Sequence, residues 1–202
     1  HYAIGAKVPM VEPSDSKEAL DFIKVAYEIS EHFDTPVLFK MCTRISHSQS
    51  VVETGIRMPV EIKQYKSNIP KYVMMPGNAR HRHPIVEQRT RDLIAFAETT
   101  TLNRMEMRET KLGIITSSTS YQYAREVFGE NVSILKLGMI YPLPEKLITD
   151  FATKVDKLII LEELDSIIED YCRRLGLNVT GKELLPLEGE YSQGLIAQEL
   201  GL

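Results

Sequence analysis

Three apolar runs decide the fold of this chain: LGIIT at 112–116, VSILKL at 132–137 and KLIIL at 157–161. A stretch with helical character follows each run, at 117–128, 144–155 and 166–175, and glycine stands at 129 and 176, where a helix commonly ends. Strands alternating with helices at this spacing predict a mainly parallel sheet with helices on both faces. We therefore predict an α/β fold with a three-layer αβα sandwich over residues 109–202. Residues 178–180 are a candidate fourth strand, and Ser192 is the expected cap of a final helix.

Residues 1–50 contain one helix between two strand-like runs. KVPMV at 7–11 is followed by Glu12-Pro13, and VLFKMC at 37–42 is nearly continuous in apolar residues, as in a strand covered on both faces. Between them, Asp15 and Glu18 have the spacing of a capping box. One βαβ unit is too little for a domain, so we expect this segment to be the last part of a larger α/β domain. The first residue is His1 rather than Met, which also leads us to expect a start in mid-protein.

Residues 51–108 are irregular and then helical. Prolines at 59, 70, 76 and 84 are expected to break any long element between residues 56 and 83. Pro84 suits the first position of a helix that continues to Ala97. A loop of this length is unusual inside a compact domain, so this segment is predicted to connect two domains.

Composition excludes several classes of protein. The 202 residues include 24 Lys and Arg against 28 Asp and Glu, a net charge of −4, which gives no reason to expect nucleic acid or an anionic membrane as a partner. No apolar run approaches the length of a membrane span. The two cysteines, Cys42 and Cys172, match no disulfide, zinc or iron–sulfur spacing, which predicts core thiols in a reducing cytoplasm and no metal site.

Ligands of open parallel sheets bind beyond the carboxyl ends of the strands, here at 117–120, 138–142 and 162–165. The serines at 117–120 could hold an anion, but no glycine fingerprint accompanies them, so helix capping is favoured. Glu162, Glu163 and Asp165 could bind a metal. Without a nearby histidine, solvated charges with Asp165 as a helix cap are favoured.

Two basic segments are candidate contact sites. RISHS at 44–48 follows a predicted strand, and its Arg44, Ser46 and His47 are predicted to contact substrate or a neighbouring surface. An ordinary hydrogen-bonded loop is the open alternative, and no nucleophile-elbow sequence is present. RHRH at 80–83 could suggest a metal site, but Arg80 and Arg82 would repel a cation. We predict that these two arginines clamp an acidic neighbouring surface.

Seven segments together resemble a known family. They are EPSDSKEA at 12–19, TPVL at 35–38, TRISHS at 43–48, KYVMMPGNAR at 71–80, SYQYA at 120–124, LKLGMIYPLPEK at 135–146 and EELD at 162–165. In this order they resemble the large (alpha) subunit of indolepyruvate ferredoxin oxidoreductases. The resemblance implies a thiamine-diphosphate enzyme that oxidatively decarboxylates arylpyruvates, such as indolepyruvate, to aryl-acetyl-CoA and passes electrons to ferredoxin.

The resemblance also implies a division of the chain. Residues 1–50 would be the C-terminal part of a thiamine enzyme's pyrimidine-binding domain, 51–108 an interdomain linker and helix, and 109–202 a transketolase-C-terminal-like domain. The full enzyme would hold thiamine diphosphate, Mg and iron–sulfur clusters. None is expected wholly within this chain, because the activating glutamate, the acidic Mg-diphosphate motif and the cluster cysteines of the family are missing, and no catalytic residue maps onto it.

On this interpretation the chain is a structural and docking portion. Its partners would be the remaining domains of the large subunit, a smaller partner subunit, ferredoxin, coenzyme A and arylpyruvate. One alternative keeps the enzyme class but takes pyruvate, 2-oxoglutarate or a branched-chain 2-oxoacid. Another is an independent α/β binding module, which predicts no exposed apolar face, whereas the first interpretation predicts one around residues 1–50.

Overall fold

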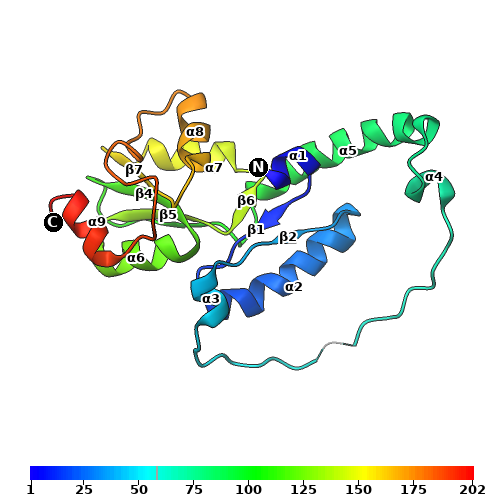
Figure 1. The fold of residues 1–202 in the computed structure, drawn as a ribbon, viewed down its shortest axis with the longest axis horizontal. Coiled ribbons are helices and arrows are strands. Elements are labelled where there is room, and N and C mark those ends of the chain that lie inside the picture. Colours follow the sequence, from blue (N-terminus) through cyan, green and yellow to red (C-terminus); the bar gives the residue numbers. More distant parts are fainter. Residues whose placement is uncertain (58) are drawn as a thin grey trace.

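The computed structural model describes residues 1–57 and 59–202, which form two sheets with helices around them (Figure 1). Sheet B has the order β3-β5-β4-β7 and contains β3 (Arg104–Glu106), β4 (Gly113–Ser117), β5 (Ser133–Leu137) and β7 (Leu158–Leu161). β4 pairs in parallel with both β5 and β7, which confirms the three predicted strands. The antiparallel edge strand β3 was not predicted. Thr180 forms only a single bridge to Ile159 rather than a fourth strand.

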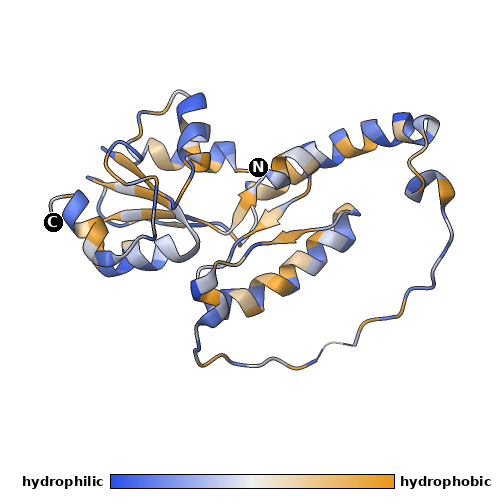
Figure 2. Cartoon of the chain, viewed as in Figure 1, coloured by the Kyte–Doolittle hydropathy of each residue, from blue (hydrophilic) through white to orange (hydrophobic). Residues whose placement is uncertain are grey.

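Helices cover both faces of sheet B, which confirms the three-layer sandwich. On one face, α6 (Ser118–Phe128) and α9 (Gln193–Glu199) pack over Ile114 and Ile134. On the other, α7 (Glu145–Ala152) and α8 (Ile167–Arg174) pack over Ile115 and Leu135. Neighbouring residues of one strand thus enter opposite core layers, because side chains alternate across a strand. Figure 2 shows the strands of sheet B in hydrophobic colours between these helices.

Sheet A joins the first forty residues to residues 139–141. Its order is β2-β1-β6, with β1 (Met10–Val11) parallel to β2 (Leu38–Phe39) and antiparallel to β6 (Met139–Tyr141). β6 follows β5 after Gly138, where an added Cβ would lie 2.4 Å from the carbonyl oxygen of Leu102. The βαβ unit of residues 1–50 was expected to be the incomplete end of a larger domain, but β6 of this chain adds a third strand, so β1 has a neighbour on each side. The reason is that the chain leaves sheet B at Gly138 and crosses to sheet A.

The predicted helix of the first segment is α2 (Ser16–Phe33). The Asp15 carboxylate accepts the Glu18 N–H, as expected for a cap, but Glu18 accepts from Ser14 rather than from Asp15. The buried face of α2 packs with β1, β6 and the end of α5. Before it lies a short helix that was not predicted, α1 (Tyr2–Ala6). The strand β1 covers only Met10–Val11 of the run predicted at 7–11.

A short helix, α3 (Thr43–His47), follows β2, and the middle segment contains α4 (Ile69–Tyr72) and α5 (Pro76–Ala97). The predicted start of the last helix at Pro84 is wrong. The helix begins at Pro76, whose fixed φ and missing N–H suit the first helical position, and Pro84 lies inside it. Figure 1 shows residues 49–57 and 59–68 running as extended chain away from both sheets. No helix in the described residues has the length and hydropathy of a membrane span.

Candidate functional site at the junction of the two sheets

The helix α3 places Arg44 against the carboxyl end of sheet B. Its guanidinium nitrogen Nη2 lies 2.6 Å from Oε2 of Glu190, in the loop before α9. The guanidinium carbon lies 5.6 Å from the centre of the Tyr123 ring on α6. The hydrogen bond to Glu190 raises the pKa of Arg44 above its ordinary value, so the guanidinium stays charged. Arg44 therefore links the N-terminal part of the chain to the C-terminal sandwich.

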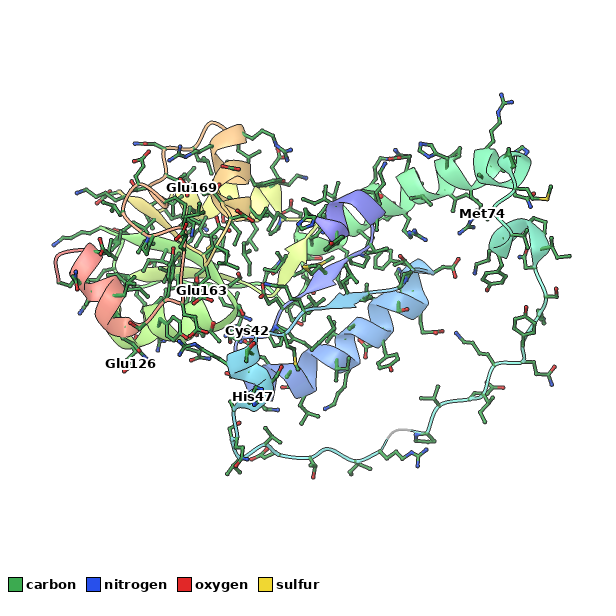
Figure 3. All side chains as sticks on the ribbon, viewed as in Figure 1. Cys42, His47, Met74, Glu126, Glu163 and Glu169 are labelled. Atoms are coloured by element: carbon green, nitrogen blue, oxygen red, sulfur yellow. The ribbon has the colours of Figure 1, made fainter. Side chains whose placement is uncertain are left out.

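Ser46 and His47 lie on the same short helix but make different contacts. The Ser46 hydroxyl donates to the carbonyl oxygen of Cys42 at 3.2 Å, which stays within the helix. His47 is exposed at the end of α3 (Figure 3). Of the three predicted contact residues, the described structure thus brings only Arg44 to the C-terminal part of the chain.

A short series of polar groups lies beside Arg44. The Cys42 thiol is 4.0 Å from the hydroxyl of Thr119, and Tyr123 follows one turn later on α6. Tyr123 is buried, and its hydroxyl has no hydrogen-bond partner within the described part of the chain. Burial raises the pKa of Tyr123, and Arg44 opposes this effect. The phenol is therefore neutral near pH 7.

The turn from β4 into α6 is unusual. Ser118 has φ of 52°, in the left-handed region that non-glycine residues rarely occupy. The prediction that these serines cap the helix is wrong, because the Ser117 side chain makes no capping bond and the Ser118 hydroxyl has no partner among the described atoms. The chain enters α6 through a left-handed residue, so neither hydroxyl reaches the first N–H groups of the helix.

The carboxylates after β7 are structural. Glu162 is 7% exposed, and its two oxygens accept the N–H groups of Ile168 and Glu169 at 2.8 and 2.9 Å. The predicted solvated cluster is therefore wrong for Glu162, which stabilises the start of α8 in place of Asp165. Burial raises the pKa of Glu162, although these two hydrogen bonds oppose the shift. Glu163 accepts the Tyr191 N–H at 2.8 Å.

A buried ion pair that was not predicted from the sequence joins α2 to sheet B. The Lys136 ammonium on β5 is fully buried and donates to the Glu18 carboxylate. Arg104 Nη1 on β3 lies 2.9 Å from the other Glu18 oxygen. That oxygen has no hydrogen bond of good geometry, so the Arg104 contact is mainly electrostatic. The sequence signal was a lysine inside the apolar strand of residues 132–137, which usually indicates a buried partner.

The same junction contains further polar bridges. The side-chain oxygen of Asn103 accepts the N–H groups of Gly138 and Met139, each at 3.0 Å, and its amide donates to the Ala97 carbonyl. The Tyr121 hydroxyl donates to Glu106 at 2.8 Å. These contacts fix the point at which the chain leaves sheet B for sheet A.

The two arginines of the RHRH segment lie on α5 and differ in their surroundings. Arg80 is exposed. Arg82 lies 3.9 Å from the Asp34 carboxylate, at the end of α2. Lys71 binds the same carboxylate at 2.5 Å, and Arg89 donates to the Asp34 carbonyl oxygen at 2.8 Å. Asp34 of this chain is thus an acidic group that Arg82 contacts.

The described residues contain no group of three or more His, Cys, Asp or Glu side chains arranged to hold a metal ion. Cys172 is buried in the core between α8 and sheet B, where burial raises the pKa of its thiol to about 12. Cys42 lies at the start of α3 instead. Neither the cysteines nor the carboxylates described here fit an iron–sulfur cluster or a magnesium ion.

Sequence comparison identifies relatives along the whole chain. The indolepyruvate oxidoreductase subunit IorA of Archaeoglobus fulgidus is 33% identical over 100% of this chain and 34% of its own length. The subunit of the same name from Methanothermobacter marburgensis is 34% identical over 99% of the chain and 35% of its own length. The chain is a homologue of the IorA subunits. This confirms the resemblance that the seven sequence segments indicated.

The chain spans about a third of the length of the curated relatives it matches. No protein-family model matches it. A solved 2-oxoglutarate:ferredoxin oxidoreductase from Magnetococcus marinus shares its fold with a TM-score of 0.62 over 96% of the chain and 41% of that protein. The sequence identity of 12% makes this a likeness of fold alone.

Proposed function

We propose that this chain is part of an oxidoreductase that oxidatively decarboxylates arylpyruvates, such as indolepyruvate, to aryl-acetyl-CoA with ferredoxin as electron acceptor. The observation that carries the proposal is the identity of 33% along the whole chain with subunits named indolepyruvate oxidoreductase. The fold likeness to a 2-oxoacid:ferredoxin oxidoreductase agrees with it. A match to a much longer enzyme subunit favours this proposal over an independent α/β binding module.

Within such an enzyme, we assign this chain a structural and docking role. Residues 1–50 would belong to the pyrimidine-binding domain, 51–108 to the interdomain linker and helix, and 109–202 to the transketolase-C-terminal-like domain. The Glu18–Lys136 pair and the Arg44–Glu190 pair support a fixed orientation of the first and last of these parts. Arg80 and Arg82 would clamp an acidic surface of a neighbouring domain.

The proposed cofactors are thiamine diphosphate with Mg and iron–sulfur clusters. The described residues lack a fitting metal or cluster site, so the remaining domains of the large subunit and the smaller partner subunit would hold these groups. Thiamine diphosphate would supply the means to stabilise the carbanion left by decarboxylation. We place the enzyme in the cytoplasm.

The substrate assignment is tested with the full-length subunit and its smaller partner subunit. Reduction of ferredoxin in the presence of coenzyme A is measured with indolepyruvate, phenylpyruvate, pyruvate, 2-oxoglutarate and a branched-chain 2-oxoacid. We expect the highest kcat/KM with the two arylpyruvates. A preference for any of the other three acids would overturn the assignment and favour the alternative within the same enzyme class.

The role of Arg44 is tested in the same assay with a matched pair of variants. Arg44→Ala removes both the ion pair with Glu190 and any substrate contact, whereas Glu190→Gln removes only the charge of the partner. If Arg44 contacts substrate, KM rises in Arg44→Ala and stays unchanged in Glu190→Gln. Equal effects of the two variants on stability, with KM unchanged in both, would assign Arg44 to the junction alone.

A further inference from the structure

Residues 51–75, of which the structure describes all but residue 58, form a segment that we call the arm. Several of its apolar side chains are almost fully in solvent, with exposed fractions of 99% for Val51, 93% for Ile56 and 92% for Ile62. Tyr65, Tyr72 and Met75 are also exposed. Figure 3 places Met74 at the turn between α4 and α5, far from both sheets. Exposed apolar surface on this scale marks an interaction site or an aggregation hazard.

The ion pairs between the arm and the rest of the described chain are weak. Lys63 pairs with Glu31 and Lys71 with Asp34, both at the C-terminal end of α2. Three of these four side chains are more than half exposed, so water and salt screen the attraction. Such ion pairs anchor two points of the arm and leave its apolar side chains uncovered.

Charge distinguishes the arm and the helix that follows it from the rest of the chain. Residues 57–91 hold eight Lys and Arg but only two Glu, in a chain whose net charge is −4. The remaining residues therefore carry a large acidic excess. The arm thus combines apolar side chains with positive charge, and its complement is an apolar surface rimmed with carboxylates.

A second part of this chain has that character. A cavity of about 610 Å³ lies between α1, α5, α7 and α8, and Ile94, Ile140 and Ile167 contribute to its wall. Glu145 and Asp170 are exposed at its edge, together with Arg174, whose guanidinium lies over the Tyr171 ring. The arm leaves α3, passes the α2 side of sheet A and returns through α4 to the start of α5 (Figure 1). The helices α1 and α5, which contribute Ile4 and Ile94 to the cavity, lie on the other side of that sheet.

We propose that the arm docks on a second copy of this chain, with its apolar side chains in that cavity and its basic side chains toward Glu145 and Asp170. Because the arm and the cavity belong to the same chain and share no residue, two copies can exchange arms reciprocally. A two-fold pair closes the contact and leaves neither arm uncovered.

Site-specific photo-cross-linking in the full-length subunit, together with its partner subunit, tests the proposal. Two differently tagged copies are co-expressed, and only one carries p-benzoylphenylalanine in place of Tyr65. We expect a cross-linked product that bears both tags, with the attachment mapped to residues around Ile167. The same probe at Tyr27, which is exposed on α2 outside the arm, serves as the matched control.

A charge variant adds a second measurement. Asp170→Lys in the receiving copy should lower the yield of the doubly tagged product several-fold, whereas Glu28→Lys, an exposed position on α2, should leave it unchanged. Cross-links within one copy, cross-links to another protein only, or a yield at Tyr65 no higher than at Tyr27 would overturn the proposal.

Discussion

At the scale of single residues, the Glu18–Lys136 pair is a buried ion pair between elements far apart in the sequence. Both side chains are buried, and they come from positions 18 and 136 of the sequence. Burial lowers the pKa of Lys136, and the attraction of Glu18 only partly offsets this effect. A buried pair of this kind contributes little net stability compared with an apolar pair, but each charge depends on the other. The Glu18–Lys136 pair matters because it fixes the position of α2 on sheet B.

Replacing Glu18 with Gln tests this dependence. The variant leaves the Lys136 ammonium buried without a carboxylate, and breaking a buried pair from one side costs about 3–5 kcal/mol. We expect the free energy of unfolding in urea to fall by that amount. The double variant Glu18→Gln with Lys136→Met removes both charges and should recover much of the loss. A Glu18→Gln variant as stable as the unchanged chain would contradict the burial of the pair.

The same pair predicts a dependence on pH. Burial alone would raise the pKa of Glu18, but Lys136 and the Ser14 hydrogen bonds outweigh it and hold the pKa below its ordinary value of 4.5. A carboxyl group with a lowered folded-state pKa contributes stability above 4.5 and loses it as the pH falls through the lowered value. Urea unfolding between pH 6 and pH 3 should show this decline, about pH 4.5 and below. In Glu18→Gln the decline should be shallower.

At the scale of elements, α5 shows that the effect of a proline on helix stability depends on its position in the helix. Pro76 occupies the first helical position, where no N–H is needed, whereas Pro84 lies eight residues into the helix. A proline at the latter position removes one backbone hydrogen bond and crowds the preceding turn. The helix continues because its C-terminal part is fixed by Leu93 and Ala97, which are buried against α2 and β6.

Substitutions of these two prolines should therefore have different effects on the stability of α5. Pro84→Ala restores the missing hydrogen bond, so we expect residues 77–90 to exchange amide hydrogen more slowly and the free energy of unfolding to rise by about 1–3 kcal/mol. Pro76→Ala should change the free energy of unfolding by less than about 0.5 kcal/mol and leave amide exchange nearly unchanged, because the first position needs no donor. Equal effects of the two variants would show that the helix does not pass through Pro84.

At the scale of the whole molecule, the two sheets differ in how they are assembled. All four strands of sheet B lie between residues 104 and 161. Sheet A needs β1 and β2 from the first forty residues and β6 from residues 139–141. The core beneath sheet A likewise contains Met139 beside Phe22 and Leu93. The N-terminal part of the chain is therefore incomplete without the C-terminal part, while the reverse dependence is weaker.

Two complementary polypeptides test this asymmetry. Residues 99–202 should retain helical circular dichroism and unfold cooperatively, although less stably than the whole chain because Lys136 loses Glu18. Residues 1–98 should show no cooperative transition, because β1 loses one of its two neighbours. Cooperative folding of residues 1–98 alone would contradict the dependence of sheet A on β6.

Sequence by itself determined the C-terminal sandwich and the family. The strands observed at 113–117, 133–137 and 158–161 were predicted at 112–116, 132–137 and 157–161, because burial on both faces leaves a continuous apolar run. The helices between them were predicted because a buried stripe recurs at helical spacing. Both signals arise from neighbouring residues, so they can be read locally. The seven segments between residues 12 and 165 likewise indicated the resemblance to IorA subunits, because each is a run of neighbouring residues.

Only the tertiary structure decided the contacts between distant residues. Four such features leave no periodic pattern in the sequence. They are the crossing of β6 to sheet A, the Glu18–Lys136 pair, the burial of Glu162 and the position of Arg82 beside Asp34. Arg44 was singled out for its charge after a strand, but its partners Glu190 and Tyr123 lie far along the chain. The physical reason is that burial and electrostatic pairing of polar groups depend on packing between elements, whereas periodicity reports only which face of one element is apolar.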